Sequence, residues 1–92
     1  MIRSFADEGT RTLFERGRTR KYAGVANVAR RKLTQVDAAA KLSDLIVPRG
    51  NRLEALSGDR EGQYSIRIND QYRVCFRWEN DEAHDVEVTD YH

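Results

Sequence analysis

The spacing of apolar residues before Pro48 is that of α-helices. Leu13 lies in a first short helix that follows two acidic residues and that Gly17 is placed to end. A second helix is predicted because apolar residues recur at steps of three and four and form one stripe: Val25, Val28, Ala29, Leu33, Val36 and Ala40. Its opposite face carries Arg30 and Arg31. A short helical turn around residues 42–46 is expected before the proline.

In the second half of the chain the period changes to two, which is typical of strands with one buried face. Apolar and polar residues alternate over residues 63–68 and 72–78. Two further strands are expected at residues 51–56 and 85–91, and a weaker signal indicates a strand at 2–5. Helices first and hairpin strands later predict an α+β fold, in which the helices cover one face of the sheet.

The turn between the two central strands decides their register. A two-residue turn at Asn69 and Asp70 would oppose core and solvent positions, so we expect a three-residue loop at 69–71. That loop places Arg67 directly opposite Arg73. Because the apolar row meets the helices, the face with these arginines is expected to point outward, and we look for function there.

Two guanidinium groups directly opposite each other need an anion, since such pairs repel by about 0.2–1 kcal/mol. A structural interpretation is that Glu87 or Asp90 of the last strand neutralises Arg67 and Arg73. A functional interpretation is that the arginines bind a phosphate, for which planar guanidinium groups offer two parallel hydrogen bonds. The pattern leaves both interpretations open.

Length and composition narrow the class of protein. The 92 residues are 39% hydrophobic and 34% charged, which predicts one small domain, residues 1–92, and excludes a membrane span or a coiled coil. The single cysteine, Cys75, permits no internal disulfide and favours a reducing compartment. The first ten residues lack an apolar run of signal-peptide length. We therefore expect a cytoplasmic protein.

Charge is divided unevenly along the chain. Residues 1–52 carry 12 Lys/Arg against 5 Asp/Glu, whereas residues 53–92 carry 4 against 10, although the net charge is only +1. A basic half favours an anionic partner. The alternative is that folding mixes the two signs into an ordinary solvated surface.

The last positions of the chain bring together side chains that suit RNA cleavage. RNA is cut without a metal or cofactor when its own 2′-hydroxyl attacks the adjacent phosphorus, given a base, a cation and an acid. Asp90 or Glu54 would be the base. Arg73 would stabilise the charged transition state, and His92 would donate a proton or add charge. Tyr91 offers an aromatic face for an unstacked base. Each residue also has an ordinary structural role open to it, as an ion-pair partner, a core cap or a chain end.

Metal and phosphate-loop chemistry is not expected. His84 and His92, with one cysteine, lack the spacing of zinc ligands, so we predict neither a metal nor a cofactor. The segment 57–62 contains glycine but lacks the lysine and the strand–loop–helix context of a phosphate loop. Its Arg60 is either solvated or in reach of an RNA backbone.

Four segments together resemble the HigB family of plasmid-maintenance toxins, and most closely the branch that includes the GraT toxin. They are Asn51–Gly62, Tyr64–Arg73, the opening Met1–Phe5 and the closing Asp90–His92. The resemblance implies a RelE-like fold, with two amino-terminal helices on one face of a twisted, mainly antiparallel sheet. It also implies ribosome-dependent cleavage of mRNA and inhibition by a HigA-like helix-turn-helix antitoxin.

The resemblance also implies roles for individual residues. Arg73 matches the phosphate-contacting arginine of the family, Asp90 a carboxylate implicated in catalysis, and Tyr91 and His92 the aromatic and histidine beside it. The sequence departs from the family at Glu54 and Ser57, where a histidine and a lysine are usual. Either Glu54 replaces the histidine as base, or the proton transfers are shared differently.

We therefore predict a type II toxin, an endoribonuclease that inhibits translation and growth. Two alternatives remain: a ribosome-binding or RNA-binding inhibitor that does not cut, and an interaction module that reaches DNA only through its antitoxin. Arg67 would join Arg73 at the RNA. The side chains expected to contact ribosomal RNA are basic: Arg16, Arg18, Arg20, Lys21, Arg30, Arg31 and Lys32.

Overall fold

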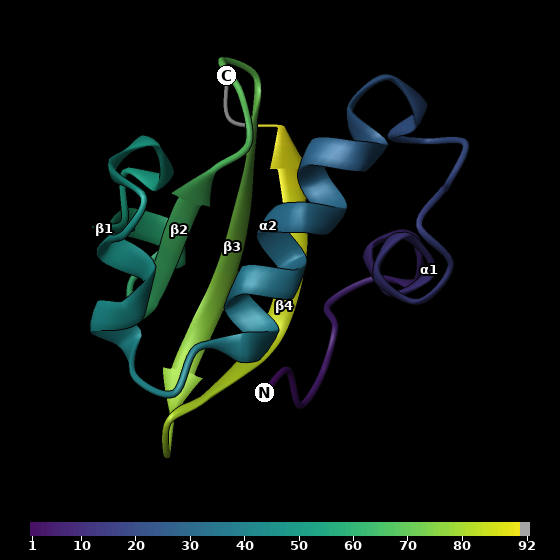
Figure 1. Cartoon of the computed structure of the whole chain (residues 1–92). Coiled ribbons are helices and arrows are strands. Elements are labelled where there is room, and N and C mark those ends of the chain that lie inside the picture. Colours follow the sequence, from purple (N-terminus) through teal and green to yellow (C-terminus); the bar gives the residue numbers. More distant parts are fainter. Residues whose placement is uncertain (91–92) are drawn as a thin grey trace.

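A computed structural model describes residues 1–90 of the chain (Figure 1). The predictions for Tyr91 and His92 therefore lie outside the described residues. The helices are α1 (Glu8–Arg16) and α2 (Ala26–Ala38). The strands are β1 (Glu54–Ala55), β2 (Gln63–Arg67), β3 (Tyr72–Glu79) and β4 (Glu82–Asp90).

Both predicted helices are present. Gly17 ends α1 with φ 78°, a left-handed conformation that glycine adopts without steric cost, and its N–H donates to the Leu13 carbonyl at 2.9 Å. The second helix begins as a 3₁₀ turn at Ala23–Val25 and continues as α2. The predicted helical turn before Pro48 is a 3₁₀ helix, Leu42–Ile46.

The strands form one antiparallel sheet in the order β1-β2-β3-β4. Ile66 pairs with Val74 and Arg67 with Arg73, which confirms the predicted register. The Ile68 N–H donates to the Tyr72 carbonyl at 2.9 Å and closes the three-residue loop. The apolar row therefore faces the helices, as the alternation predicts.

Two strand predictions differ from the structure at their ends. The strand expected at 51–56 is reduced to β1, because Arg49–Asn51 is a 3₁₀ turn. The last strand begins at Glu82, earlier than expected, because Asn80 and Asp81 both have positive φ and form a tight turn after β3. Such turns match the twist of a hairpin. Asn80 and Asp81 are residue types that favour such turns, so the sequence did contain a signal for the earlier start of β4.

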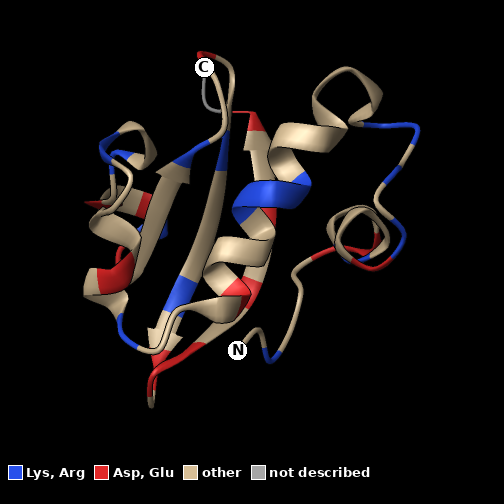
Figure 2. Cartoon of the chain, viewed as in Figure 1, with Lys and Arg blue, Asp and Glu red and all other residues tan. Residues whose placement is uncertain are grey.

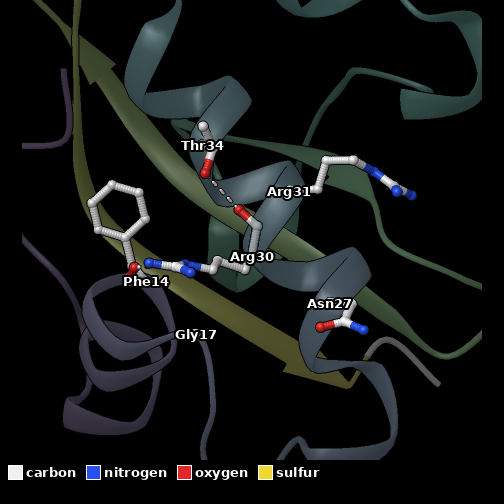
Figure 3. Close-up of a pocket in the computed structure, with 6 residues that line it drawn as sticks. All are labelled: Phe14, Gly17, Asn27, Arg30, Arg31 and Thr34. Atoms are coloured by element: carbon white, nitrogen blue, oxygen red, sulfur yellow. Dashed lines mark hydrogen bonds between the residues drawn. The ribbon is translucent and has the colours of Figure 1, made fainter.

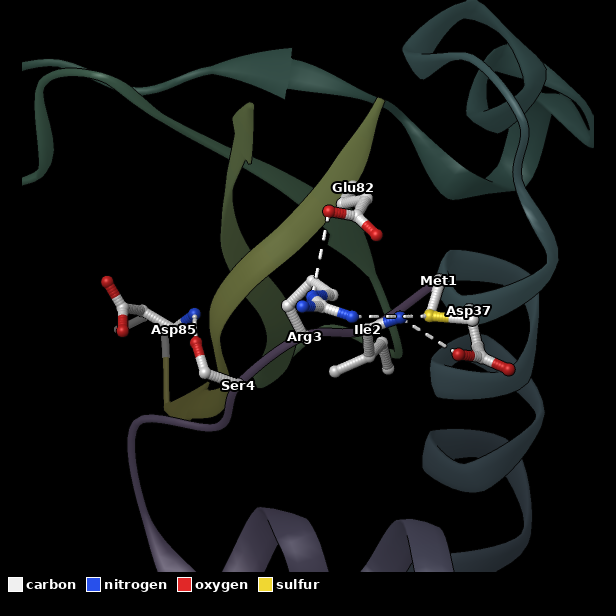
Figure 4. Close-up of polar contacts among 7 residues, drawn as sticks. All are labelled: Met1, Ile2, Arg3, Ser4, Asp37, Glu82 and Asp85. Atoms are coloured by element: carbon white, nitrogen blue, oxygen red, sulfur yellow. Dashed lines mark hydrogen bonds and ion pairs between the residues drawn. The ribbon is translucent and has the colours of Figure 1, made fainter. Parts of the chain in front are cut away.

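The amino-terminal segment lies along the outer edge of β4. Ile2 and Phe5 form parallel bridges with β4, as the weak strand signal at 2–5 indicated. The Ile2 N–H also donates to Asp37 Oδ1 of α2 at 2.9 Å, and the Asp85 N–H donates to Ser4 Oγ at 2.9 Å (Figure 4). The segment thus supplies partners for backbone groups at an otherwise open sheet edge.

The hydrophobic core lies between the helices and one sheet face, and α2 crosses that face in Figure 1. Its largest fully buried side chains include Leu13, Leu33, Leu45, Ile66, Val74, Phe76 and Val86. The buried Tyr22 hydroxyl donates to the Val88 carbonyl at 3.0 Å and ties the start of the second helical segment to β4. This arrangement confirms the α+β class. Within residues 1–90, no helix is long and apolar enough to cross a membrane.

Candidate active site

The sheet face turned away from the helices, called the outer face below, carries the polar row of β2, β3 and β4. Its residues include Ser65, Arg67, Arg73, Cys75, Glu87 and Thr89. Ser65 and Cys75 are fully buried, at 0% exposure, although they point away from the core. Longer side chains of the same face therefore exclude solvent from its centre.

Arg73 is held at several points on the outer face. Its Nε donates to Ser65 Oγ at 2.7 Å, and its Nη2 donates to the Arg52 carbonyl at 2.8 Å. Nη2 also lies 3.9 Å from Glu54 Oε1, and the Arg73 side chain is only 11% exposed. Glu54 reaches this position because it pairs with Ser65 across β1 and β2. The structure thus brings together two of the predicted catalytic residues, Arg73 and Glu54.

Within residues 1–90, the acids paired with the two facing arginines include two that were not expected. Arg67 pairs with Asp70 of the β2–β3 loop, whereas Arg73 has Glu54 nearby. Glu87 pairs instead with Arg60, at 3.2 Å. The sequence analysis named only acids of the last strand. Asp70 and Glu54 reach the arginines from a loop and from an edge strand, and the sequence pattern does not show how these two segments fold.

Arg60 is engaged within the protein. Its Nη1 lies 3.2 Å from Glu87 Oε1 and donates to Gln63 Oε1 at 3.0 Å. Glu87 lies directly opposite Cys75 on β4, so this ion pair sits beside the buried thiol. Contact between Arg60 and RNA stays a prediction, and a phosphate would have to compete with Glu87 for the guanidinium.

Asp90 does not share the outer face with Arg73. It pairs with Tyr72, whereas Arg73 pairs with Thr89, so the alternation of the strands assigns Asp90 to the side of the helices. Its Oδ2 accepts a hydrogen bond from Gln71 Nε2 at 3.1 Å. It also lines a cavity of about 250 Å³ together with Lys21 and Tyr22. Of the two candidate bases, only Glu54 therefore lies on the face of Arg73.

Cys75 behaves as a buried structural residue. Burial raises the pKa of its thiol, and this outweighs the opposing effects of the neighbouring Thr89 and of the nearby Arg60 and Arg73. A thiol with a raised pKa stays protonated and is a poor nucleophile. The geometry agrees with the sequence interpretation of Cys75 as an ordinary small residue.

Basic side chains are concentrated around α2 and the loop that joins it to α1 (Figure 2). Those that are exposed include Arg16, Arg18, Arg20, Lys21, Arg30 and Arg31. An open groove of about 440 Å³ lies between the end of α1 and α2 (Figure 3). Within it the Arg30 Nε donates to the Phe14 carbonyl at 3.2 Å, and so satisfies an acceptor in the last turn of α1.

Lys32 does not belong to this exposed basic surface, and its position argues against the predicted contact with RNA. It is 9% exposed, and its Nζ donates to Asn51 Oδ1 at 2.6 Å in the interior. Burial lowers the pKa of its ammonium group, and the positive charges of Arg31 and Arg67 lower it further. Its place in the sequence, one helical turn before Val36, was the signal that it faces inward.

Residues 1–90 contain no group of three or more His, Cys, Asp or Glu side chains placed to hold a metal ion. What the outer face does present is the Arg73 guanidinium beside the Glu54 carboxylate. A carboxylate accepts a proton, and a guanidinium stabilises phosphate charge.

Three comparisons relate the chain to known toxins by sequence. The family model of the RelE-like toxin HigB, from type II toxin–antitoxin systems, matches residues 3–92. Toxin HigB-1 of Vibrio cholerae serotype O1 is 48% identical over 56 residues, which are 61% of this chain and 59% of that toxin. Endoribonuclease HigB of Proteus vulgaris is 34% identical over 100 residues, with 100% of each chain covered. The match thus spans about three fifths of the first relative and all of the second.

Solved structures show the same fold. The chain is similar to one in the YoeB–YefM complex from Staphylococcus aureus, with a TM-score of 0.62 and 16% sequence identity. The alignment covers 100% of this chain and 98% of that one. A heterotetrameric YoeB–YefM toxin–antitoxin complex from the same organism gives the same values. At this identity the similarity concerns the fold alone.

Proposed function

This chain belongs to the HigB-like family of RelE-like type II toxins, and we propose on that basis that it is an endoribonuclease that cuts mRNA on ribosomes. Its relative from Proteus vulgaris is named Endoribonuclease HigB, and the two chains align over their full lengths. The observation that carries the proposal is the convergence of Arg73 and Glu54 on the outer face, 3.9 Å apart. A guanidinium beside a carboxylate supplies the cation and the base that 2′-hydroxyl attack requires.

In the proposed reaction the 2′-oxygen bonds to phosphorus as Glu54 takes its proton. The scissile diester competes with Glu54 for Arg73, which stabilises the negative charge that builds up on the phosphoryl oxygens. The bond from phosphorus to the 5′-oxygen then breaks, and an acid protonates the departing oxygen. The products are a 2′,3′-cyclic phosphate and a 5′-hydroxyl.

Glu54 is preferred to Asp90 as the base because it shares a face with Arg73. We assign the proton donor to His92 and the base-stacking surface to Tyr91, on the resemblance to the family and on their proximity in sequence to Asp90. Asp90, held by Gln71, would help to orient the end of the chain rather than accept the proton.

The exposed basic residues around α2 would bind the phosphate backbone of ribosomal RNA, which favours clustered Lys and Arg. By analogy with the YoeB–YefM complexes, a protein antitoxin would inhibit the toxin, and we expect one of the HigA helix-turn-helix type. Contact with DNA would come only through that antitoxin. A toxin that acts on ribosomes would work in the cytoplasm.

Mapping the 5′ ends of cellular mRNA after induction tests the proposal. We expect new 5′-hydroxyl ends within codons for the native chain and none for Arg73→Ala. Stalled but intact messages would contradict the enzymatic function and indicate a non-catalytic inhibitor. An absence of any growth defect would indicate an interaction module of the antitoxin complex.

A further inference from the structure

Two oxygen atoms of the chain accept hydrogen bonds from the Arg73 guanidinium. The Ser65 hydroxyl accepts from Nε at 2.7 Å, and the Arg52 carbonyl accepts from Nη2 at 2.8 Å. These two acceptors are called the clamp below. Because they engage two different nitrogens of one planar group, the clamp fixes the plane of the guanidinium as well as its position.

Ser65 is suited to this role by its place in the sheet. It lies on β2 directly opposite Cys75, one step along the outer face from the Arg67–Arg73 pair, so Arg73 reaches it diagonally across the two strands. Its side chain is fully buried, and a buried hydroxyl requires a hydrogen-bond partner. Both members of the contact are therefore held in one arrangement.

The second half of the clamp is anchored to the helical layer. Arg52 has left-handed backbone angles, φ 47° and ψ 54°, which set the direction of its carbonyl toward Arg73. The preceding Asn51 is fully buried, and its Nδ2 donates to the Leu45 carbonyl at 3.2 Å. Its Oδ1 accepts from Lys32 of α2 at 2.6 Å. The carbonyl is thus fixed by the interior of the protein.

Arg67 shows what the clamp adds. It lies on the same face, directly opposite Arg73, but its contact is with Asp70, whose side chain is 99% exposed in the hairpin loop. A carboxylate so exposed to solvent holds a guanidinium less firmly than a buried acceptor does. Of these two arginines, Arg73 is the one with a preorganised orientation.

We propose that Ser65 is a positioning residue for Arg73, acting through the clamp to aim the guanidinium at the scissile phosphate. This inference rests on the proposed function. Displacement of a catalytic group by about 1 Å costs on the order of 100-fold in rate. Loss of the contact between Ser65 Oγ and Arg73 Nε should therefore slow cleavage strongly while leaving RNA binding largely unchanged.

Single-turnover cleavage of an mRNA on programmed ribosomes tests this with a double-mutant cycle. Ser65→Ala should lower the maximal cleavage rate about 10- to 100-fold with little change in the half-saturating ribosome concentration. Ser65→Ala combined with Arg73→Lys, which keeps a positive charge but lacks the Nε that Ser65 holds, should be no slower than Arg73→Lys alone, because Ser65 acts through Arg73. Full multiplication of the two effects, or a native rate for Ser65→Ala, would overturn the proposal.

Cys75→Ala is the matched control, since Cys75 is equally buried and lies directly opposite Ser65 on the outer face. Cys75→Ala removes one side-chain atom, as Ser65→Ala does, and this variant should cleave at the native rate. A loss as large as that of Ser65→Ala would show that any cavity on this face slows cleavage, and would count against positioning.

A spectroscopic measurement tests the clamp without relying on cleavage. In ¹⁵N-labelled native protein, the Arg73 Nε–H should exchange with solvent slowly, whereas that of the exposed Arg31 should exchange fast. Ser65→Thr, which keeps the hydroxyl, should preserve the slow exchange. If native Arg73 exchanges as fast as Arg31, the clamp is refuted. If the clamp is observed but native protein does not cut RNA, the proposed function fails instead.

Discussion

Arg67 and Arg73 lie directly opposite each other on β2 and β3, yet each guanidinium has its own acidic neighbour, Asp70 for one and Glu54 for the other. Among residues 1–90, two separate carboxylates thus lie beside the two facing guanidinium groups. Arg67 faces the exposed loop, whereas Arg73 is buried against Ser65. The two arginines should therefore respond differently to removal.

Arg73→Ala should abolish growth inhibition and also lower the free energy of unfolding by about 1–3 kcal/mol. The stability loss follows because the buried Ser65 hydroxyl is left without its donor. Arg67→Ala removes a solvent-exposed pair and should cost at most about 1 kcal/mol. Urea unfolding and growth assays of both variants check this, and equal stability losses would show that the environments do not differ.

Ribosome binding should weaken steeply as salt is raised, because bound phosphates release counterions. Removing one exposed charge in the basic surface, Arg16→Gln or Arg18→Gln, should lower the slope of log K against log salt by about 1. Lys32→Met should leave the slope unchanged, since Lys32 is buried against Asn51. Binding titrations over a range of salt concentrations measure this. If Lys32→Met reduced the slope as much as Arg16→Gln does, Lys32 would be in contact with the RNA.

Gly17→Ala should destabilise the protein by about 1–2 kcal/mol, since its φ of 78° is unfavourable for any residue with a Cβ. The added Cβ would also lie 2.7 Å from Arg30 Nη1 and displace that side chain from its place beside α1. Gly24→Ala is the control, because no atom lies within 4 Å of its added Cβ. The midpoint of urea unfolding should fall for Gly17→Ala alone, and an equal fall in both would indicate a general effect of losing glycine.

The buried Lys32 should make stability rise with pH in the alkaline range. Its pKa is lowered in the folded protein, chiefly by burial, from 10.5 in the unfolded chain. Between the folded pKa and 10.5 the unfolded chain binds more protons, so the free energy of unfolding increases with pH there. The measurement is urea unfolding of native protein and Lys32→Gln at several alkaline pH values. The difference between them should grow in favour of the native chain as pH approaches 10.5, and a constant difference would contradict the assigned burial.

The sequence was informative wherever a single strand or turn decided the outcome. The three-residue loop and the pairing of Arg67 with Arg73 follow from the period of two, because a shift of one residue would turn every apolar side chain outward. It was misleading where a long side chain has two possible environments. Lys32 was grouped with the exposed lysine and arginine side chains because of its charge. Its position on the apolar stripe of the helix nevertheless agrees with the burial that the structure shows.

The sequence by itself determined the two helices, the register of the central hairpin and the face on which Arg73 lies, because backbone periodicity and turn length set them locally. Only the tertiary structure decided what surrounds that guanidinium. The Arg52 carbonyl and the Glu54 carboxylate come from a connecting segment that returns to the sheet about twenty residues before Arg73, and Asp90 is turned to the other face by its pairing with Tyr72. Such contacts depend on how separate segments pack together, which no local pattern specifies.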